Sequence, residues 1–403
     1  MKNYKFTTAI LAILFICSNI LMAQSYCNDK MLVGAARMDQ YLTSLKGKQV
    51  GIVMNQSSLV GSSLIVDTLL KRGVAVKKIF APEHGFRGTA DAGEHLNNGI
   101  DSKTGLAIVS LYGEHRMPTK EDLQDIDIIL YDLQDVGVRF YTYLGTLDYV
   151  MHAAAIHHKQ VIVLDRPNPN GFYVDGPMPS ASKYSFVCMH KVPVVHGMTA
   201  GEYAQMVNGE GWLIQTSVGS IQCDLKVIPC KNYTHKDFYQ LMVKPSPNLA
   251  NMRAIYLYPS LCWFEGTPIS LGRGTDKAFQ IYGSPALSKN NFNFQFTPTS
   301  RVGAKNPPCL NQLCNGEDLS NLTESSLQTK PGIDLSYLYK AYHAYPNPEK
   351  FFSEFFNTLD GGNKLQIQLK NGLSPADIKA SWESDLIKFK QMRKKYLLYE
   401  DFE

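Results

Sequence analysis

The most constraining feature of this chain is an alternation of apolar, strand-like segments with helical segments over its first half. Period and composition predict strands at 48–54, 74–80, 107–112, 127–133, 160–164 and 225–228. Helices are predicted over 62–72, 143–157 and 199–207, the last with Thr199 as N-cap and Glu202 in capping-box spacing. Apolar strands separated by helices indicate a parallel sheet covered on both faces. We therefore predict an α/β fold with a Rossmann-like parallel sheet.

The pattern changes beyond about residue 238, where short apolar segments, prolines and aromatic residues dominate. A closing helix is predicted over 374–399, and its basic run 388–395 is expected to form a solvated face. A chain of 403 residues can form two cores. We therefore expect a Rossmann-like domain over 24–235 and a smaller α+β domain over 236–403 that completes a cleft.

The N-terminus has the pattern of a secretory leader. Lys2 and Lys5 precede an apolar segment, 8–16, and a cleavage site near residue 23 is expected. The sequence therefore predicts a signal peptide over 1–23 and a secreted or periplasmic protein. The apolar segment is too short for a stable membrane span. Cys17 and Cys27 fit a lipoprotein cleavage box poorly, so a lipid anchor is not favoured.

Charge and cysteine spacing limit the partners. The net charge of +4 is weak and dispersed, which argues against a nucleic-acid partner. Seven cysteines follow the leader, and the Cys223/Cys230 and Cys309/Cys314 pairs could each close a small loop in an oxidising compartment. No Cys/His spacing indicates a zinc site.

Nucleotide cofactors are also not expected. The loop after the first strand, 55–61, lacks the glycine-rich fingerprint that lets a pyrophosphate approach a helix N-terminus, and no Walker A sequence occurs. The Gly272-Arg273-Gly274 segment follows no strand–helix unit. The prediction is that the protein needs no cofactor.

Polar clusters follow five of the predicted strands. Their members are Asn55; Glu83, His84 and Arg87; Tyr112 and Glu114; Asp132, Arg139 and Tyr143; and Asp165 and Arg166. Because the carboxyl ends of parallel strands meet at one edge of a sheet, these side chains are expected to line one crevice. Any single cluster could instead cap a helix or form a surface pair.

Two carboxyl groups across such a crevice can hydrolyse a glycosidic bond, provided that one is protonated near neutral pH. Tyrosine and tryptophan rings suit stacking on sugar faces, although Tyr141 and Trp263 are more simply core residues. Arginines would suit an anionic ligand, because the guanidinium pairs with a carboxylate in a bidentate manner.

A long series of motifs resembles the exo-β-N-acetylmuramidase NamZ family, once known only as a bacterial domain of unknown function. The motifs include Asn55-Gln56-Ser57, 82–88, 132–137, 139–143, 164–169, 196–199, 245–249, 265–267 and 272–275. The resemblance covers nearly the whole mature chain. It implies a glycosidase that releases N-acetylmuramic acid from the non-reducing end of peptidoglycan fragments. It also implies a site between the two domains, without metal or nucleotide. The lactyl carboxylate of muramic acid would explain the arginines.

The resemblance carries site residues over unevenly. Glu83 is the first choice for a catalytic carboxylate, with Asp175 and Glu114 as candidates for the second. Family members often have Glu where this chain has Asp175 and His152. Residues expected to bind substrate are Asn55, His84, Arg87, Tyr112, Asp132, Arg139, Tyr143, Asp165, Arg166, Asn248, Glu265 and Arg273. Asp132 and Asp165 also stay candidates for the second carboxylate. Asp165 and Arg166 could equally form a buried ion pair.

Two other functions stay open. If the second carboxylate is absent, the same scaffold could bind peptidoglycan fragments without cleaving them. A hydrolase of another bond is less favoured, because no Gly-x-Ser-x-Gly elbow is present. The expected partners are peptidoglycan-derived muramic acid saccharides, and the sequence leaves open whether the protein is a homodimer.

Overall fold

The computed structural model describes residues 31–86, 98–180, 183–216 and 219–403. The expected leader, Cys17, Cys27 and Arg87 lie outside these ranges. The main sheet has the order β11-β8-β7-β1-β4-β6-β5, with all neighbours parallel except β5 and β6. Its strands are β1 (Gln49–Met54), β4 (Ala75–Ala81), β5 (Gly99–Ile100), β6 (Ala107–Ser110), β7 (Ile128–Asp132), β8 (Gln160–Leu164) and β11 (Asp224–Ile228).

Helices cover both faces of this sheet, because neighbouring residues of each strand point to opposite faces. Val50 and Ile52 of β1 pack with the helices on one face, and Val53 packs in the core on the other. The helices of the first half are η1 (Gly34–Ala36), η2 (Met38–Gln40), α2 (Leu42–Leu45), α3 (Ile65–Lys71), α4 (Lys120–Leu123), α5 (Tyr143–Ile156) and α6 (Ala200–Gly209). Helices α2 and α3 pack on the first face, and α4, α5 and α6 pack on the second. The predicted α/β fold with a parallel sheet is confirmed.

Small hairpins and a second group of elements complete the chain. The hairpins are β2 (Leu59–Val60) with β3 (Ser63–Leu64), and β9 (Ile214–Thr216) with β10 (Gly219–Ile221). The later half has an antiparallel sheet, β12-β14-β13. Its strands are β12 (Ile281–Ser284), β13 (Phe294–Phe296) and β14 (Cys314–Asp318). Its helices are α7 (Met252–Leu261), η4 (Cys262–Gly266), α8 (Glu324–Thr329), α9 (Ser336–Ala344), η5 (Pro348–Lys350), α10 (Glu354–Asp360), α11 (Lys364–Lys370), α12 (Pro375–Ala380), α13 (Glu383–Arg393) and η6 (Lys394–Tyr396).

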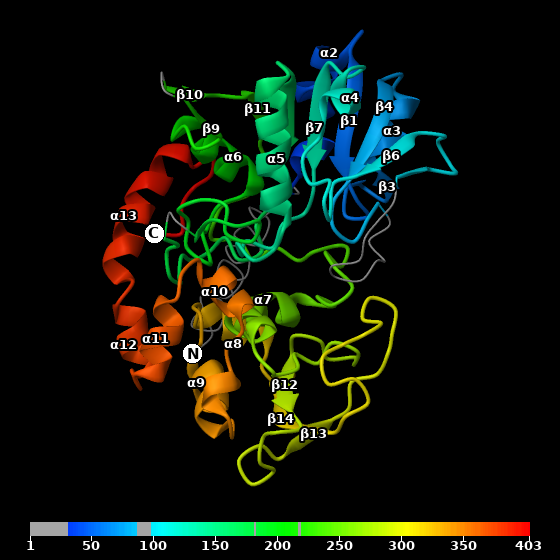
Figure 1. The fold of residues 1–403 in the computed structure, drawn as a ribbon. Helices are drawn as coiled ribbons and strands as arrows, with labels where there is room; N and C mark the ends of the chain where they lie inside the picture. The colour runs from blue at the N-terminus through cyan, green and yellow to red at the C-terminus, as the bar shows by residue number, and fades with distance from the viewer. Residues whose placement is uncertain (1–30, 87–97, 181–182, 217–218) are drawn as a thin grey trace, which may run out of the picture.

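Figure 1 shows the main sheet above this second group, with α13 running along one side from α12 back toward α6. The single closing helix predicted over 374–399 is wrong, because the chain turns at Ser381, whose hydroxyl donates to the Ile378 carbonyl at 2.7 Å. Arg393 is not solvated as predicted. It is fully buried and pairs with Asp401. The domain boundary near residue 235 stays a prediction.

The predicted capping box is confirmed, whereas the two possible cysteine pairings are not formed. Helix α6 begins with Thr199 as N-cap in a reciprocal capping box with Glu202. The six cysteines in the described ranges are free thiols, so neither expected pairing is formed in this structure. None of the helices in those ranges is long and apolar enough to cross a membrane.

Candidate active site

A cavity of about 850 Å³ lies where the two halves of the chain meet. The first half contributes Glu83, His84, Tyr112, Arg116, Phe140, Tyr141, Thr142 and residues 185–187. The second half contributes Ser246, Glu265, Arg273, residues 303–308, Phe355 and Thr358. This volume is within the usual range for small-molecule sites, and the walls mix aromatic and charged side chains.

Glu83 reaches the cavity from the turn that follows β4. The Gly85 amide donates to the Pro82 carbonyl at 2.9 Å, and both His84 (φ 67°) and Gly85 (φ 74°) adopt the left-handed conformation. That conformation is costly for a residue with a Cβ and is concentrated at functional sites. His84 is nonetheless mostly buried and lines the cavity with Glu83. The turn therefore presents both side chains to one hollow.

Thr142 fixes one oxygen of the Glu83 carboxylate. Its hydroxyl donates to Glu83 Oε2 at 2.6 Å. Thr142 directly precedes α5, so a strand-end carboxylate and a helix-start hydroxyl meet at the cavity wall. Tyr141 lies beside it, and its hydroxyl donates to the Pro245 carbonyl of the second half at 2.7 Å.

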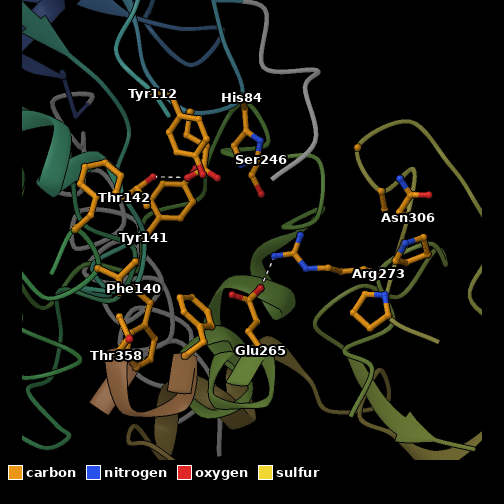
Figure 2. A pocket seen from close by; sticks show the side chains of 18 of the residues that line it. His84, Tyr112, Phe140, Tyr141, Thr142, Ser246, Glu265, Arg273, Asn306 and Thr358 are labelled. Carbon is orange, nitrogen blue, oxygen red and sulfur yellow. Dashed lines mark hydrogen bonds and ion pairs between the residues drawn. The ribbon is translucent and has the colours of Figure 1, made fainter. Parts of the chain in front are cut away.

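A second carboxylate, Glu265, faces the same cavity from η4. It accepts a hydrogen bond from the Arg273 guanidinium. In the chain, Arg273 lies between Gly272 and Gly274, which both adopt the left-handed conformation. Burial alone would lower the pKa of Arg273, but the Glu265 carboxylate holds it above its ordinary value. Figure 2 shows this pair across the hollow from Thr142, His84 and Tyr112. The cavity thus has an acidic group on each side.

The structure brings together five of the sequence-predicted residues at this cavity: Glu83, His84, Tyr112, Glu265 and Arg273. Arg87 lies outside the described residues. Within the described residues, no three His, Cys, Asp or Glu side chains are grouped as a metal site would require. The other predicted residues lie elsewhere, and most of them are buried by covering segments.

Four of these residues lie at the carboxyl ends of β1, β7 and β8, a region that we call the covered edge. They are Asn55, Asp132, Asp165 and Arg166. Arg166 pairs with Asp132, not with its neighbour Asp165, through bonds of 2.5 and 2.9 Å. Asn55 donates to the Tyr143 hydroxyl at 2.6 Å. The hydrogen-bonding groups of these side chains are bonded to other protein groups, and the side chains do not line the cavity.

Asp165 is held by a segment from far along the chain. Its carboxylate accepts from the Tyr399 hydroxyl at 2.5 Å and from the Gly201 amide at 2.8 Å. Burial raises the pKa of Asp165 to about 6. Nearby, the buried Glu202 pairs with His235 and accepts from the Leu398 amide. The region around residues 398–399 therefore covers this end of the sheet.

Arg139 and Asn248 bond to backbone carbonyls and do not line the cavity. The buried Arg139 guanidinium donates to four carbonyls, those of Pro177, Val192, Leu359 and Asp360. Asn248 donates to the Gly303 carbonyl at 2.9 Å and so fixes the start of the 303–308 loop. Both residues shape the cavity from outside it.

The two candidates for the second catalytic carboxylate also lie outside the cavity lining. Asp175 accepts from the Lys379 ammonium at 2.8 Å and from the Ile333 amide at 2.7 Å, so its carboxylate joins two segments of the later half to the first. Glu114 is an exposed residue. Glu265 is therefore the second acid that the geometry favours.

Arg116 belongs to the polar cluster after the third predicted strand but was not chosen as a site residue. Sequence reasoning missed several other wall residues: Phe140, Thr142, Phe186, Ser246, residues 303–308, Phe355 and Thr358. Tyr141, which we expected in the core, also lines the cavity, whereas Trp263 is fully buried as expected. The 139–143 motif could have indicated Thr142, because its chosen members Arg139 and Tyr143 flank it. The 303–308 loop has no periodic pattern that could have revealed it.

The chain is similar to known proteins over most of its length. Two family models match: "Exo-beta-N-acetylmuramidase NamZ, N-terminal" over residues 50–253 and "Exo-beta-N-acetylmuramidase NamZ, C-terminal" over 256–399. A curated relative from Bacillus subtilis (strain 168), "Peptidoglycan beta-N-acetylmuramidase NamZ", is 36% identical over 380 residues. That match covers 90% of this chain and 89% of the relative.

Two crystal structures of DUF1343 family proteins from Bacteroides fragilis NCTC 9343 are also similar. One has a TM-score of 0.84 and 47% identity, and covers 93% of this chain and 100% of its own. The other has a TM-score of 0.77 and 27% identity, and covers 92% of this chain and 99% of its own. Sequence and fold thus agree over nearly the whole chain.

Proposed function

This chain belongs to the exo-β-N-acetylmuramidase NamZ family, and from that premise we propose that it is a glycosidase that removes N-acetylmuramic acid from the non-reducing end of peptidoglycan fragments. The observation that carries the proposal is the position of Glu83 on the wall of a sugar-sized cavity, with Glu265 facing it from the other half. Paired carboxyl groups that flank a glycosidic bond are the usual apparatus of glycoside hydrolysis.

The two carboxyl groups have different surroundings, which suggests different roles. Arg273 holds Glu265 as an anion, so Glu265 suits the stabilisation of positive charge at the anomeric carbon. Glu83, whose Oε2 accepts a hydrogen bond from the Thr142 hydroxyl, is assigned the role of general acid. As the bond from the anomeric carbon breaks, Glu83 would pass its proton to the leaving oxygen. Water would then supply the hydroxyl group of the released sugar, and its other proton would return to Glu83.

Aromatic walls support a sugar ligand. Tyr112, Phe140 and Tyr141 line the cavity beside the carboxyl groups. Tyr141 is anchored by its hydrogen bond to Pro245 and by an edge-on contact with Tyr143 at a centroid distance of 4.6 Å. Such fixed rings present apolar faces to a pyranose at little entropic cost.

We also propose that the protein acts after export, in the periplasm or outside the cell. The leader-like pattern at 1–23 supports this proposal, and peptidoglycan fragments are found in those compartments. Secretion of a tagged full-length chain from its bacterial host, with N-terminal sequencing of the secreted form, would test it. A chain retained in the cytoplasm with its first residues intact would contradict it.

The activity is tested by release of nitrophenol from the 4-nitrophenyl β-glycoside of N-acetylmuramic acid. Wild type should release it, and Glu83→Gln should lower kcat by about 10²- to 10⁴-fold, the range for loss of a general acid. Glu265→Gln should also lower kcat, because the variant lacks the anion that Arg273 holds. The matched control is Glu114→Gln, which removes an exposed carboxylate outside the cavity and should leave kcat unchanged.

The outcomes separate the competing ideas. If wild type binds N-acetylmuramic acid but releases no nitrophenol, the protein is a binding protein on this scaffold. If Glu83→Gln keeps full activity, Glu83 has no part in the chemistry. If Glu114→Gln loses activity as strongly as Glu83→Gln, the cavity assigned here is not the site.

A further inference from the structure

Arg116 is a cavity residue whose charge the proposed chemistry does not use. Its guanidinium carbon lies 4.7 Å from the centroid of the Phe186 ring, and both residues line the cavity. Among the residues that the structure describes, no carboxylate pairs with Arg116, whereas Arg273 at the same cavity is neutralised by Glu265. Arg116 is exposed to solvent at the cavity mouth, and a guanidinium in such a position suits an anionic group on the ligand.

Phe186, on which Arg116 lies, is itself held in place. Its ring stacks on Tyr149 of α5 at a centroid distance of 5.7 Å and an interplanar angle of 19°. It also packs directly on Gly145 of the same helix, where an added Cβ would lie 2.8 Å from the ring. The glycine therefore permits the close approach, and helix α5 sets the position of the ring. Stacking on an aromatic face leaves the N–H groups of a guanidinium free to donate in its plane.

We propose that Arg116, fixed on Phe186, recognises a carboxylate of the substrate and thereby selects sugars that carry an acidic substituent. The inference rests on the proposed function, in which the sugar carries a lactyl group. A carboxylate matches the paired donors of a guanidinium, which the compact ammonium of Lys305, another wall residue, does not offer. Two carboxylates could serve: the lactyl group itself, or the end of a peptide attached to it.

The test measures binding by calorimetry in the otherwise wild-type protein, and no turnover occurs because the ligands carry no glycosidic bond. The ligands are N-acetylmuramic acid, N-acetylglucosamine, the neutral lactyl amide of N-acetylmuramic acid, and N-acetylmuramoyl-L-alanine. The Arg116→Gln substitution should raise the Kd for N-acetylmuramic acid about tenfold, the loss typical of a hydrogen bond to a charged group. It should leave the Kd for N-acetylglucosamine and for the amide unchanged. Phe186→Leu, which keeps the cation but removes its platform, should give a smaller loss in the same direction.

Each outcome has a meaning. A loss confined to N-acetylmuramoyl-L-alanine supports carboxylate recognition with the peptide as its source. Equal loss for all four ligands, or no loss for any, overturns the proposal. Arg301→Gln is the control, because it removes an arginine that pairs with Asp276 outside the cavity lining, and it should change nothing.

This binding assay is independent of the activity. If wild type fails to hydrolyse the nitrophenyl glycoside but Arg116→Gln still weakens N-acetylmuramic acid selectively, the proposed function fails and the assignment of Arg116 stands. If hydrolysis is observed and Arg116→Gln has no selective effect, the proposed function stands and the assignment of Arg116 fails.

Discussion

Two regions at the same edge of the main sheet contain the same kinds of residue and do different work. At the open edge, after β4 and β6, Glu83, His84 and Tyr112 face the cavity. At the covered edge, after β1, β7 and β8, Asp132, Asp165 and Arg166 are buried and bonded to other protein groups. The difference is made by distant segments: the second half leaves a hollow over one region, and the Tyr399 segment lies over the other. A charged strand end is therefore a ligand site only where no other part of the chain covers it.

The largest expected effect tests the covered edge. Arg166→Met leaves the Asp132 carboxylate, which has no exposed surface, without its partner. The free energy of unfolding should fall by about 3 to 5 kcal/mol, as for other broken buried pairs. Urea unfolding followed by circular dichroism measures it. The double variant Asp132→Leu/Arg166→Met should recover most of the loss, because no buried charge then lacks a partner.

The comparison would break if Arg166→Met kept its stability and lost activity. In that case Arg166 would act on substrate, as the sequence alone suggested. The comparison is supported if Arg166→Met lowers the free energy of unfolding but keeps a normal kcat per folded molecule, measured at low temperature.

The next expected effect is smaller and is a gain in the free energy of unfolding. It concerns Asp135, which follows β7. One of its carboxylate oxygens accepts from the Gly137 amide at 2.6 Å, and the other is buried without a hydrogen-bond partner among the described residues. Burial raises the pKa of Asp135 to about 7. The folded state therefore holds the proton more tightly than the unfolded state, and this group's contribution to stability falls as pH rises from about 4 to about 7.

Asp135→Asn should remove the loss of stability that the Asp135 carboxyl causes as pH rises. At pH 8 the variant should be more stable than wild type by at most about 4 kcal/mol, since each unit of pKa shift corresponds to about 1.4 kcal/mol. Below pH 4 the two proteins should have similar stability. Unfolding by urea across pH 4 to 8 gives the difference directly, and comparing the two proteins cancels the parallel contribution of Asp165. A constant difference at every pH would show that Asp135 does not titrate in this window.

The smallest expected effect tests the open edge. Thr142→Val removes the hydroxyl that donates to Glu83 but keeps the shape of the side chain. We expect kcat on the nitrophenyl glycoside to fall about tenfold, the equivalent of one hydrogen bond of about 1.4 kcal/mol, with little change in KM. Thr142→Ser should restore most of the rate. A rise in KM with unchanged kcat would instead make Thr142 a residue that contacts the ground-state substrate.

The sequence predicted the fold well because strand and helix periods are local properties. The strand over 160–164 and the capping box at Thr199 were predicted correctly, since each depends on neighbouring residues alone. The closing helix was wrong, because its turn at Ser381 accompanies the burial of Trp382 against distant residues. Long-range packing decided that outcome.

The candidate site was predicted less completely for the same reason. Motif position showed that Glu83, Glu265 and Arg273 matter, and the structure brings all three to one cavity. It could not separate them from Asp165, because the group that covers Asp165 is Tyr399, 234 residues away along the chain. Nor could it give Arg116 a role, because the position of this side chain depends on Phe186 and on the small size of Gly145.

The bond between Asp165 and Tyr399 has a consequence for the order of events during synthesis. Every strand of the main sheet is made before residue 229, yet the sheet's end is closed only by residues near 398. At ordinary bacterial translation speeds the ribosome needs roughly 10 to 50 seconds to add the intervening 234 residues. During that interval the nascent first half lacks the Tyr399 hydroxyl that donates to Asp165 and the Leu398 amide that donates to Glu202. A sheet end that closes this late would suit the export proposed above, because passage through a protein-conducting channel requires a chain that has not finished folding.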